Sequence, residues 1–411
     1  MANPHADIIE DILEVADRGE SVDRMEPMLL PEDSRRRGPL TDLSIELAAK
    51  SAGFRRSLPS GVRIALADLV RAMNCYYSNL IEGHDTHPVD IERALKDDYS
   101  PDPRRRELQL EARAHIAVQR WIDEGHLRQR ALSIDGIRDI HQRFYNLLPE
   151  QLQAVEELET QARLRVVPGE LRRHDVQVGR HFSISPGAIP RFLKEFERVY
   201  SRLGTTDTLL SAAAAHHRLL WIHPFLDGNG RVARLMSHAV LLETLDTGGI
   251  WSVARGFARN VAAYKRHLGE CDLRRRNGLD GRGRLNEEGL IGFTRYFLET
   301  CLDQIHFMDE MVQPERLRAR ILIWAQEETQ LNRLPAQAVH VLEAVLYRGM
   351  LPRGEVAGIL GLTPRHGRRI VSTLLDYGVL TSEGPRDPLF LSFPAALATR
   401  WMPGLFPEGT A

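Results

Sequence analysis

Residues 223–234 bring together groups that could bind a phosphorylated ligand. Gly228 and Gly230 can adopt positive φ, which lets successive backbone N–H groups converge on one anion. The helix predicted to follow adds the positive end of its dipole. Arg231 and Arg234 lie three residues apart, so both guanidinium groups would face one side of that helix and bind further phosphate oxygens. The segment therefore predicts a binding site for a triphosphate.

Two other side chains of this segment suit chemistry at such a phosphate. Asp227 offers hard carboxylate oxygens, which proteins use to hold Mg²⁺ that is shared with phosphate groups. His223 has an ordinary pKa near neutrality and could accept the proton of an attacking hydroxyl. We predict Asp227 as a metal ligand and His223 as a general base.

Each of these residues also has a plain structural interpretation. A histidine beside a proline is commonly structural, and two arginines on a helix commonly form a solvated face. Gly228, Gly230 and Ala233 satisfy the GxGxxA pattern of dinucleotide-binding folds, but that pattern follows a buried strand, and here a predicted helix precedes it. The order of the whole segment, rather than any one residue, favours a catalytic site.

The segment HPFLDGNGRVAR resembles the signature HPFxxGNGRxxR of the Fic family of nucleotidyl transferases at every fixed position. Asp227 stands at the usual acidic position, and the resemblance covers residues 106–300. It implies transfer of AMP from ATP to a Ser, Thr or Tyr hydroxyl of a protein. In that reaction His223 would be the general base and Asp227 would hold Mg²⁺ against the phosphates.

The resemblance also assigns the remaining polar groups of the segment. Asn229 and the amides of Gly228 and Gly230 would stabilise charge on the α-phosphate. Arg231 and Arg234 would orient the departing pyrophosphate. These roles agree with the residue chemistry, because phosphoryl-type transfer depends chiefly on positioning and electrostatics.

A short hairpin is predicted upstream of the motif, in the segment HDVQVGRHFSIS. Its residues Val176, Gln177, Val178 and Gly179, followed by Arg180, resemble the target-binding flap of Fic proteins. An exposed hairpin edge can pair with an extended target through main-chain hydrogen bonds, which would make the enzyme tolerant of target sequence. An ordinary structural hairpin is the alternative.

Tyr264 lies in the segment NVAAYKRHLGECD, where similar proteins keep a tyrosine near the adenine. Seven residues later, where some of these proteins have asparagine, this chain has Cys271. The resemblance implies an adenine contact for Tyr264 and leaves the other adenine contacts open.

Ser78, Glu82 and Gly83 resemble the inhibitory motif [S/T]xxxE[G/N] of Fic proteins, in the class that carries it N-terminal to the core. On residue type alone, Glu82 would be a surface carboxylate and Gly83 a helix stop. The resemblance implies that Glu82 pairs with Arg234, so that ATP binds poorly or with its α-phosphate misaligned. The same carboxylate could instead position water against an AMP-modified protein, so removal of AMP is an alternative activity.

Composition excludes several other classes of protein. The 411 residues exceed one ordinary domain, and a net charge of −2 provides no chain-wide positive field for nucleic acid or an acidic membrane. The three cysteines lie far apart, which argues against a disulfide framework or a thiolate zinc site. A Gly-Lys phosphate loop, HExxH and GxSxG are all missing from the sequence. The acidic start and the lack of a long apolar run predict a cytoplasmic protein without a membrane partner.

Apolar residues recur mostly at intervals of three and four, which predicts a mainly α fold built on a Fic helical core with a small β-hairpin flap. The hairpin is the only strand signal that we find before residue 370. Pro, Gly and charge cluster at residues 97–107, 274–288 and 333–335, which are the expected joints. The predicted units are an N-terminal helical region with the inhibitory helix (1–105), the Fic catalytic core (106–300), a helical connector (301–333) and a C-terminal winged helix-turn-helix (334–411).

The C-terminal unit resembles a winged helix because three helical stretches precede an alternating segment, VLTSEGPRDPLFLSF. Residues 331–411 contain eight Arg against six Asp plus Glu, a net charge of +2, which is weak for a committed DNA binder. The unit could instead dock proteins or form a homodimer. In a DNA-binding version, the residues of the third helix that reach the groove would be Arg365, His366, Arg368 and Arg369.

The leading hypothesis is a protein AMP-transferase that uses ATP and Mg²⁺. Its partner would be a target protein modified on a hydroxyl, with the chain itself as one candidate. The competing hypothesis is a DNA-binding regulator in which the Fic fold senses a nucleotide. A different phosphate-containing donor also remains open at this point.

Overall fold

Helices form most of the chain in this computed structural model, which describes residues 15–156, 163–179, 181–278, 281 and 283–406. The predicted mainly α fold with small β-hairpins is confirmed. Arg180 of the predicted flap lies outside the described residues.

The helices of the N-terminal third build one side of the molecule. The longest of them, α2, ends at Gly83, whose φ of 89° is the left-handed conformation expected of a glycine helix stop. These helices are α1 (Arg37–Ser57), α2 (Ser60–Glu82), α3 (Pro88–Leu95), α4 (Pro103–Asp123) and α5 (Ile134–Asn146).

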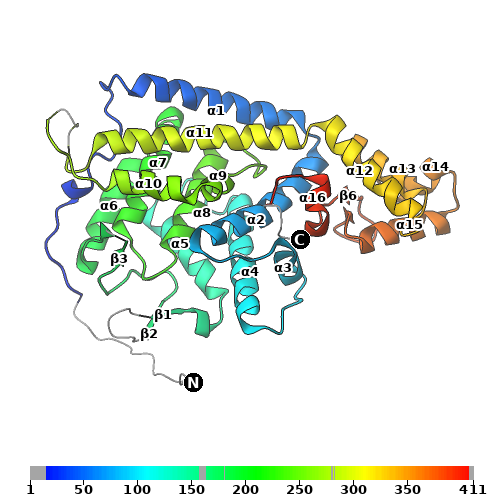
Figure 1. The fold of residues 1–411 in the computed structure, drawn as a ribbon, viewed down its shortest axis with the longest axis horizontal. Coiled ribbons are helices and arrows are strands. Elements are labelled where there is room, and N and C mark those ends of the chain that lie inside the picture. The colour runs from blue at the N-terminus through cyan, green and yellow to red at the C-terminus, as the bar shows by residue number, and fades with distance from the viewer. Residues whose placement is uncertain (1–14, 157–162, 180, 279–280, 282, 407–411) are drawn as a thin grey trace.

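The central helices surround a buried pair, α7 and α8, which pack on each other and carry the chemistry-bearing loop between them. In Figure 1, α11 runs beside α1 along the edge of the molecule. The helix α7 begins after Gly204 without a side-chain cap, and Asp207 in its first turn pairs with Arg37 of α1. The central helices are α6 (Ile189–Tyr200), α7 (Thr205–Ile222), α8 (Asn229–Leu245), α9 (Ala254–Arg259), α10 (Val261–Cys271) and α11 (Glu287–Met311).

The helices α12 to α15 follow α11 and extend to one end of the molecule in Figure 1, whereas α16 lies nearer the middle. Thr363 accepts a hydrogen bond from the His366 amide, so it caps the helix that begins at Pro364. These helices are α12 (Pro314–Gln330), α13 (Ala338–Arg348), α14 (Val356–Leu360), α15 (Pro364–Asp376) and α16 (Ala398–Trp401). Single 3₁₀ turns occur at η1 (Val22–Met25), η2 (Glu150–Leu152), η3 (Pro186–Ala188), η4 (Arg353–Glu355) and η5 (Ala395–Leu397).

Strands occur as short antiparallel pairs. The expected hairpin is present as β3 (Gln177–Val178) and β4 (His181–Phe182), and the alternating C-terminal segment forms β5 (Leu380–Thr381) and β6 (Phe390–Leu391). A further pair, β1 (Ala154–Glu156) with β2 (Arg163–Arg165), shows that the hairpin was not the only strand structure before residue 370. The residues between its strands, 157–162, include no Gly, Pro, Asn or Asp, so the sequence gives no turn signal for this pair.

The C-terminal unit packs on both ends of α2. At the start of α2, a Cβ on Gly61 would lie 1.7 Å from the Gly349 carbonyl oxygen, so only glycine permits this contact. Near its end, the Tyr77 hydroxyl donates to the Leu405 carbonyl at 2.8 Å. We call residues 402–406 the C-terminal tail. The position of α2 is therefore set partly by residues more than three hundred positions later.

A search of the described part of the chain for helices of sufficient length and hydropathy to cross a bilayer finds none.

Candidate active site

The loop between α7 and α8 is shaped by two residues with positive φ. His223 ends α7 with φ 51° and ψ 62°, and Gly228 precedes α8 with φ 77°. A left-handed conformation is uncommon for a non-glycine residue, so His223 holds a strained position at the turn. The loop brings His223 and the N-terminus of α8 to the same side of the molecule.

The Asn229 side chain stabilises this loop through two hydrogen bonds to the Phe225 backbone. Its Oδ1 accepts from the Phe225 amide at 3.0 Å, and its Nδ2 donates to the Phe225 carbonyl at 2.8 Å. The Phe225 ring is buried and stacks on His141 with ring centres 3.9 Å apart. Asn229 thus shapes the loop, and its contact with an α-phosphate stays a prediction.

Only one of the two predicted glycine positions has the expected backbone. Gly228 has positive φ, whereas Gly230 lies in the first turn of α8 with helical geometry. Gly230 is needed for space, because a Cβ there would lie 2.4 Å from Glu82 Oε1. The missing side chain lets the Glu82 carboxylate approach the N-terminus of α8.

The His223 imidazole is partly exposed beside this loop. Its Nδ1 lies 3.3 Å from the Leu220 carbonyl, which favours a proton on Nδ1 and leaves Nε2 as the basic nitrogen. Burial, together with the positive charge of Arg172, lowers the pKa of His223 to about 4. The imidazole is therefore neutral near pH 7, as a general base must be.

Asp227 reaches solvent at the open side of the loop, where 47% of its side chain is exposed. Its Oδ2 accepts from the Tyr145 hydroxyl at 2.6 Å and lies 4.0 Å from Arg231 Nη1. A half-exposed carboxylate of this kind fits a Mg²⁺ ion that takes its other oxygen ligands from phosphates and water. Tyr145 orients the carboxylate for that purpose.

Arg231 is held by a carboxylate that the sequence did not indicate. Its Nη2 donates to Glu111 Oε2 of α4 at 3.0 Å, and its guanidinium lies 5.2 Å from the centre of the Phe144 ring. Glu111 also contacts His84 Nδ1 at 2.9 Å, and this contact raises the pKa of His84. Arg231 is thus neutralised and oriented from α4.

Arg234 is held by the segment that resembles the inhibitory motif. Its Nε donates to Ser78 Oγ at 2.9 Å, and its Nη2 donates to the Ser78 carbonyl at 3.3 Å and to Glu82 Oε1 at 2.5 Å. Burial opposes ionisation of Glu82, but the Arg234 charge outweighs it and holds the pKa of Glu82 below its usual value. The structure therefore brings Ser78, Glu82 and Arg234 together as an ion pair with added hydrogen bonds.

Tyr264 lies in the interior rather than at the loop surface. Its ring is 2% exposed and stacks on Phe257 at 4.5 Å, and its hydroxyl lies 2.7 Å from His216 Nε2. Cys271 is fully buried as well. In this conformation Tyr264 supports α7, and its expected adenine contact stays a prediction.

The flap residues Val176, Gln177, Val178 and Gly179 lie in an exposed hairpin whose base joins the loop through Arg172. The buried Arg172 side chain donates to the His223 carbonyl at 2.7 Å, and its amide donates to the Pro224 carbonyl at 2.9 Å. His181 of β4 lies 2.8 Å from the Trp221 carbonyl. Hydrogen bonds from Arg172 and His181 thus join the flap to the end of α7 and the loop that follows it.

Three residues of the site were missed by sequence reasoning, namely Tyr145, Glu111 and Arg172. Each lies outside the motif and acts through a contact with a residue distant in the chain, so motif spacing gave no signal for it.

Comparison with known proteins places the same region in one family. A model of the Fic/DOC family matches residues 131–241, which include the loop and most of α8. Protein adenylyltransferase Fic of Drosophila erecta is 41% identical over 76 residues, which are 18% of this chain and 15% of that protein. Its counterpart from Drosophila ananassae is 26% identical over 205 residues, or 48% of this chain and 38% of that protein. The chain thus spans less than half the length of these curated relatives.

Two solved structures are similar to the chain. A Fic family protein from Desulfovibrio desulfuricans G20 has a TM-score of 0.48 at 14% identity and covers 85% of this chain and 96% of its own. A Fic domain containing signaling protein from Bacteroides thetaiotaomicron VPI-5482 has a TM-score of 0.47 at 18% identity, covering 65% of this chain and 96% of its own. The family match therefore shows a Fic domain at residues 131–241, and the loop between α7 and α8 lies within it.

Proposed function

We propose that this protein transfers AMP from ATP to the hydroxyl of a Ser, Thr or Tyr side chain in a target protein. One observation carries the proposal: residues 224–228 join the neutral His223, at the end of α7, to the glycine-containing N-terminus of α8, which carries two buried arginines. This arrangement supplies a base, an anion-binding helix end and cations for a leaving polyphosphate. Curated relatives of the matched region are named protein adenylyltransferase, which supports the same reaction.

The proposed reaction is an in-line displacement at the α-phosphorus of ATP. The target hydroxyl oxygen forms a bond to this phosphorus as its proton passes to His223 Nε2. The bond between the α-phosphorus and the bridging oxygen breaks, and pyrophosphate leaves with the electron pair. Arg231 and the freed Arg234 would bind the pyrophosphate oxygens, and the α8 amides would stabilise charge at the α-phosphate. A Mg²⁺ ion at Asp227 would supply charge neutralisation for the phosphates.

The contact of Glu82 with Arg234 restrains this activity in the proposal. A guanidinium that donates to Ser78 and Glu82 has fewer groups left for the γ-phosphate. The carboxylate itself lies over Gly230 and adds a negative charge where the phosphates would bind. The resting protein is thus poorly active, and a change that withdraws Glu82 activates it.

The test uses ATP labelled on the α-phosphate or on the γ-phosphate, with the full chain carrying Glu82→Gly incubated in a bacterial lysate. We expect label from the α-phosphate on protein, and its loss when His223→Ala is added to Glu82→Gly. Label from the γ-phosphate alone would contradict the proposal, since it indicates transfer of a terminal phosphate. Mass spectrometry of the labelled proteins would identify the target and any modification of the chain itself. Loss of AMP from pre-modified protein in the wild-type chain would instead favour AMP removal.

A second candidate function is binding of duplex DNA by the C-terminal unit, and the surface of α15 favours it. Arg365, Arg368 and Arg369 are exposed on the face of α15 opposite its buried residues, and within the described structure none of the three forms an ion pair. In Figure 1, α15 lies at the end of the molecule far from the flap, so DNA would not cover the active site. Unpaired arginines on an outward helix suit phosphate and base contacts.

This candidate predicts salt-dependent binding of the full chain to a labelled duplex. Changing the three arginines to Gln should reduce the slope of log affinity against log salt by about three, because each phosphate contact contributes about 0.9. The matched control changes Arg104, Arg105 and Arg106, an exposed run at the start of α4, in the same way. An equal slope in both triple variants would exclude α15 as the DNA surface.

A further inference from the structure

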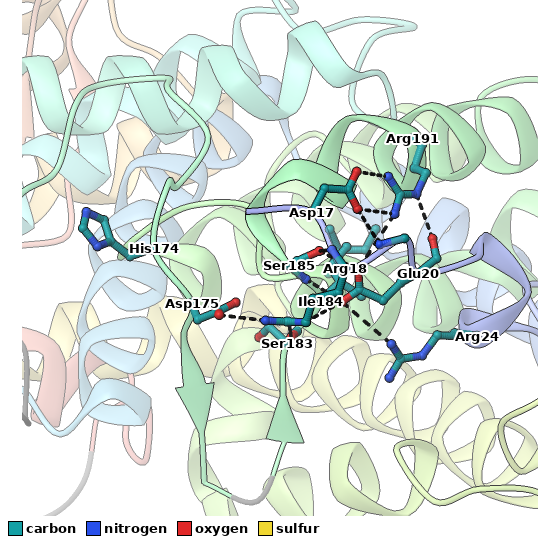
Figure 2. A network of polar contacts seen from close by, with 12 residues as sticks. Asp17, Arg18, Glu20, Arg24, His174, Asp175, Ser183, Ile184, Ser185 and Arg191 are labelled. Atoms are coloured by element: carbon teal, nitrogen blue, oxygen red, sulfur yellow. Dashed lines mark hydrogen bonds and ion pairs between the residues drawn. The ribbon is translucent and has the colours of Figure 1, made fainter. Parts of the chain in front are cut away.

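The first residues that the structure describes, 15–20, run beside residues 183–187, which follow β4 (Figure 2). The Gly187 amide donates to the Ala16 carbonyl at 2.9 Å. A Cβ on Gly187 would lie only 2.7 Å from the Cβ of Asp17, so the two segments leave no room for a larger residue there. We call residues 15–20 the strap.

Glu20 fixes the strap to the segment after the flap. Its carboxylate accepts from the Ser185 amide at 2.9 Å and from the Ser185 hydroxyl at 2.5 Å, and it lies 3.1 Å from Arg18 Nε. Only 6% of the Glu20 side chain is exposed. A buried carboxylate with this many donors is costly to leave unpaired, so the contact holds the strap firmly.

Arg18 closes the open end of the flap hairpin, as Figure 2 shows. Its Nη1 donates to Asp175 Oδ2 at 2.7 Å, on the leg that leads into β3. Its Nη2 donates to the Ser183 carbonyl at 3.3 Å, on the leg that leaves β4. Its guanidinium also lies 5.7 Å from the centre of the Phe182 ring. One strap residue therefore bridges both legs of the hairpin.

Arg172 links both legs of the hairpin to the loop between α7 and α8. Its side chain donates to the His174 carbonyl at 2.8 Å and to the Ile184 carbonyl at 2.6 Å, one on each leg of the hairpin. It also donates to the His223 carbonyl at 2.7 Å. A continuous set of contacts thus runs from the strap, through the base of the flap, to the general base.

We propose that the strap sets the position of the flap over His223, with Arg18 as a positioning residue for the target protein. The inference rests on the proposed AMP transfer and names what orients its protein substrate. Each strand of the flap contributes two residues, and Val178 and Phe182 are 50% and 59% exposed, so the hairpin has little packing of its own. An isolated two-stranded hairpin is marginal in water, so its base must be held from outside.

A flap that is already ordered loses less conformational entropy when it binds a target than a disordered flap does. If the strap released the hairpin, the flap would first have to be ordered whenever a target segment paired with it, which weakens binding. The proposed ATP-binding groups lie on α8 and in the loop, whereas the strap contacts described above go to Asp175, Ser183 and Ser185. Loss of Arg18 should therefore raise KM for the protein acceptor and leave KM for ATP unchanged.

The first measurement is hydrogen–deuterium exchange of the full wild-type chain and of Arg18→Ala. We expect the peptides that contain β3 and β4 to exchange about threefold to tenfold faster in Arg18→Ala. Arg35→Ala is the matched control, because Arg35 is an exposed arginine of the same N-terminal region that does not contact the flap. Arg18→Lys, which keeps the charge but cannot bridge both legs, should exchange at an intermediate rate.

The second measurement is steady-state AMP transfer in a Glu82→Gly background, with purified His223→Ala chain as the acceptor. Arg18→Ala should raise KM for this acceptor about threefold to tenfold with kcat and KM for ATP retained, and Arg18→Lys should recover part of the loss. Arg35→Ala should match the parent. Arg172→Met is a second probe that should raise the acceptor KM and also lower kcat, because it detaches the His223 backbone.

These results separate the inference from the function on which it rests. If the Glu82→Gly parent transfers no AMP, the proposed function fails, while the exchange comparison still reports whether the strap holds the flap. Flap exchange equal to that of Arg35→Ala overturns the inference. Faster exchange with an unchanged acceptor KM also overturns it, since the strap would then be only a structural support.

Discussion

At the scale of single residues, the site is governed by which anion Arg234 contacts. Glu82 and Ser78 satisfy its guanidinium from α2, and the absence of a side chain at Gly230 lets the carboxylate approach. ATP would have to compete with a preformed ion pair in which Arg234 is buried and 35% of the Glu82 side chain is exposed. Because charge-assisted hydrogen bonds are stronger than neutral ones, the charge of residue 82 should matter more than its size.

Replacing Glu82 tests this competition directly. Glu82→Gly should bind ATP about tenfold or more tightly than wild type, and Glu82→Gln, which keeps the size but loses the charge, should lie between them. Isothermal titration calorimetry with ATP and Mg²⁺ on the full chain measures the difference. Glu46→Gln, an exposed carboxylate on α1, is the control and should bind like wild type. Glu82→Gln binding as weakly as wild type would show that charge is not the cause.

The second arginine of the motif depends on Glu111. Glu111→Gln would leave the buried Arg231 without its full negative partner. We expect the free energy of unfolding to fall by about 1–3 kcal/mol, and KM for ATP to rise severalfold in a Glu82→Gly background. Urea unfolding and initial rates measure the two effects. A higher rate at unchanged KM would contradict the orienting role and make Glu111 a second restraint.

At the scale of elements, α2 carries the Glu82 carboxylate of the proposed restraint, and three contacts hold this helix. Gly61 packs on the Gly349 backbone, Tyr77 bonds to Leu405 of the C-terminal tail, and Glu82 pairs with Arg234. The Tyr77 contact lies little more than one helical turn before Glu82. The tail therefore supports the end of α2 that carries the inhibitory carboxylate.

Loosening the tail should loosen the restraint. The Phe406 ring lies edge-on to Tyr76 at 5.4 Å and is almost fully buried. Phe406→Ala should lower the free energy of unfolding by about 3 kcal/mol and raise AMP transfer above that of wild type. Phe393→Ala is the matched control, because Phe393 packs on Trp401 rather than on α2. Denaturant unfolding and α-label transfer measure the two effects, and equal activity of both variants would contradict the link.

The sequence predicted the parts of the fold whose signals are local. The helix stop at Gly83, the turn at Gly228 and the hairpin each follow from residue type and spacing. Pairing of Glu82 with Arg234 was expected through family resemblance, since nothing local joins residues so far apart. Other features depend on packing between distant segments, which single-sequence patterns do not encode. They are the burial of Tyr264, the hydrogen bond from Arg231 to Glu111 and the contacts of Arg172.

At the scale of the whole molecule, burial keeps several histidines neutral, four of them in the interior and one, His223, at the partly exposed loop. Burial lowers the pKa of these side chains from an ordinary value of 6.5 to about 3 or about 4. They are His115, His141, His216, His217 and His223. The unfolded chain binds protons on them at pH values where the folded chain does not.

This difference predicts acid sensitivity above the range in which carboxylates titrate. As pH falls from 7 towards 4, each histidine should cost up to about 1.4 kcal/mol of stability per pH unit, because protons favour the unfolded state. Thermal unfolding of the full chain is measured at pH values of about 8, 7, 6 and 5. The melting temperature should be level between the first two pH values and then fall steeply. His216→Gln should reduce the slope. A melting temperature that stays level down to a pH of about 5 would contradict the assignment of neutral histidines.

The bond from Tyr77 to Leu405 joins positions 328 residues apart, and this spacing matters while the chain is being made. Translation runs from the N-terminus, so α2 leaves the ribosome before residues 402–406, and the aromatic face of α2 stays uncovered until they follow. A nascent chain, or one cleaved by a protease before residue 402, would carry Glu82 on a helix that lacks the hydrogen bond from Tyr77 to Leu405. Synthesis of the tail would then also be the step that completes the proposed restraint on the Arg234 site.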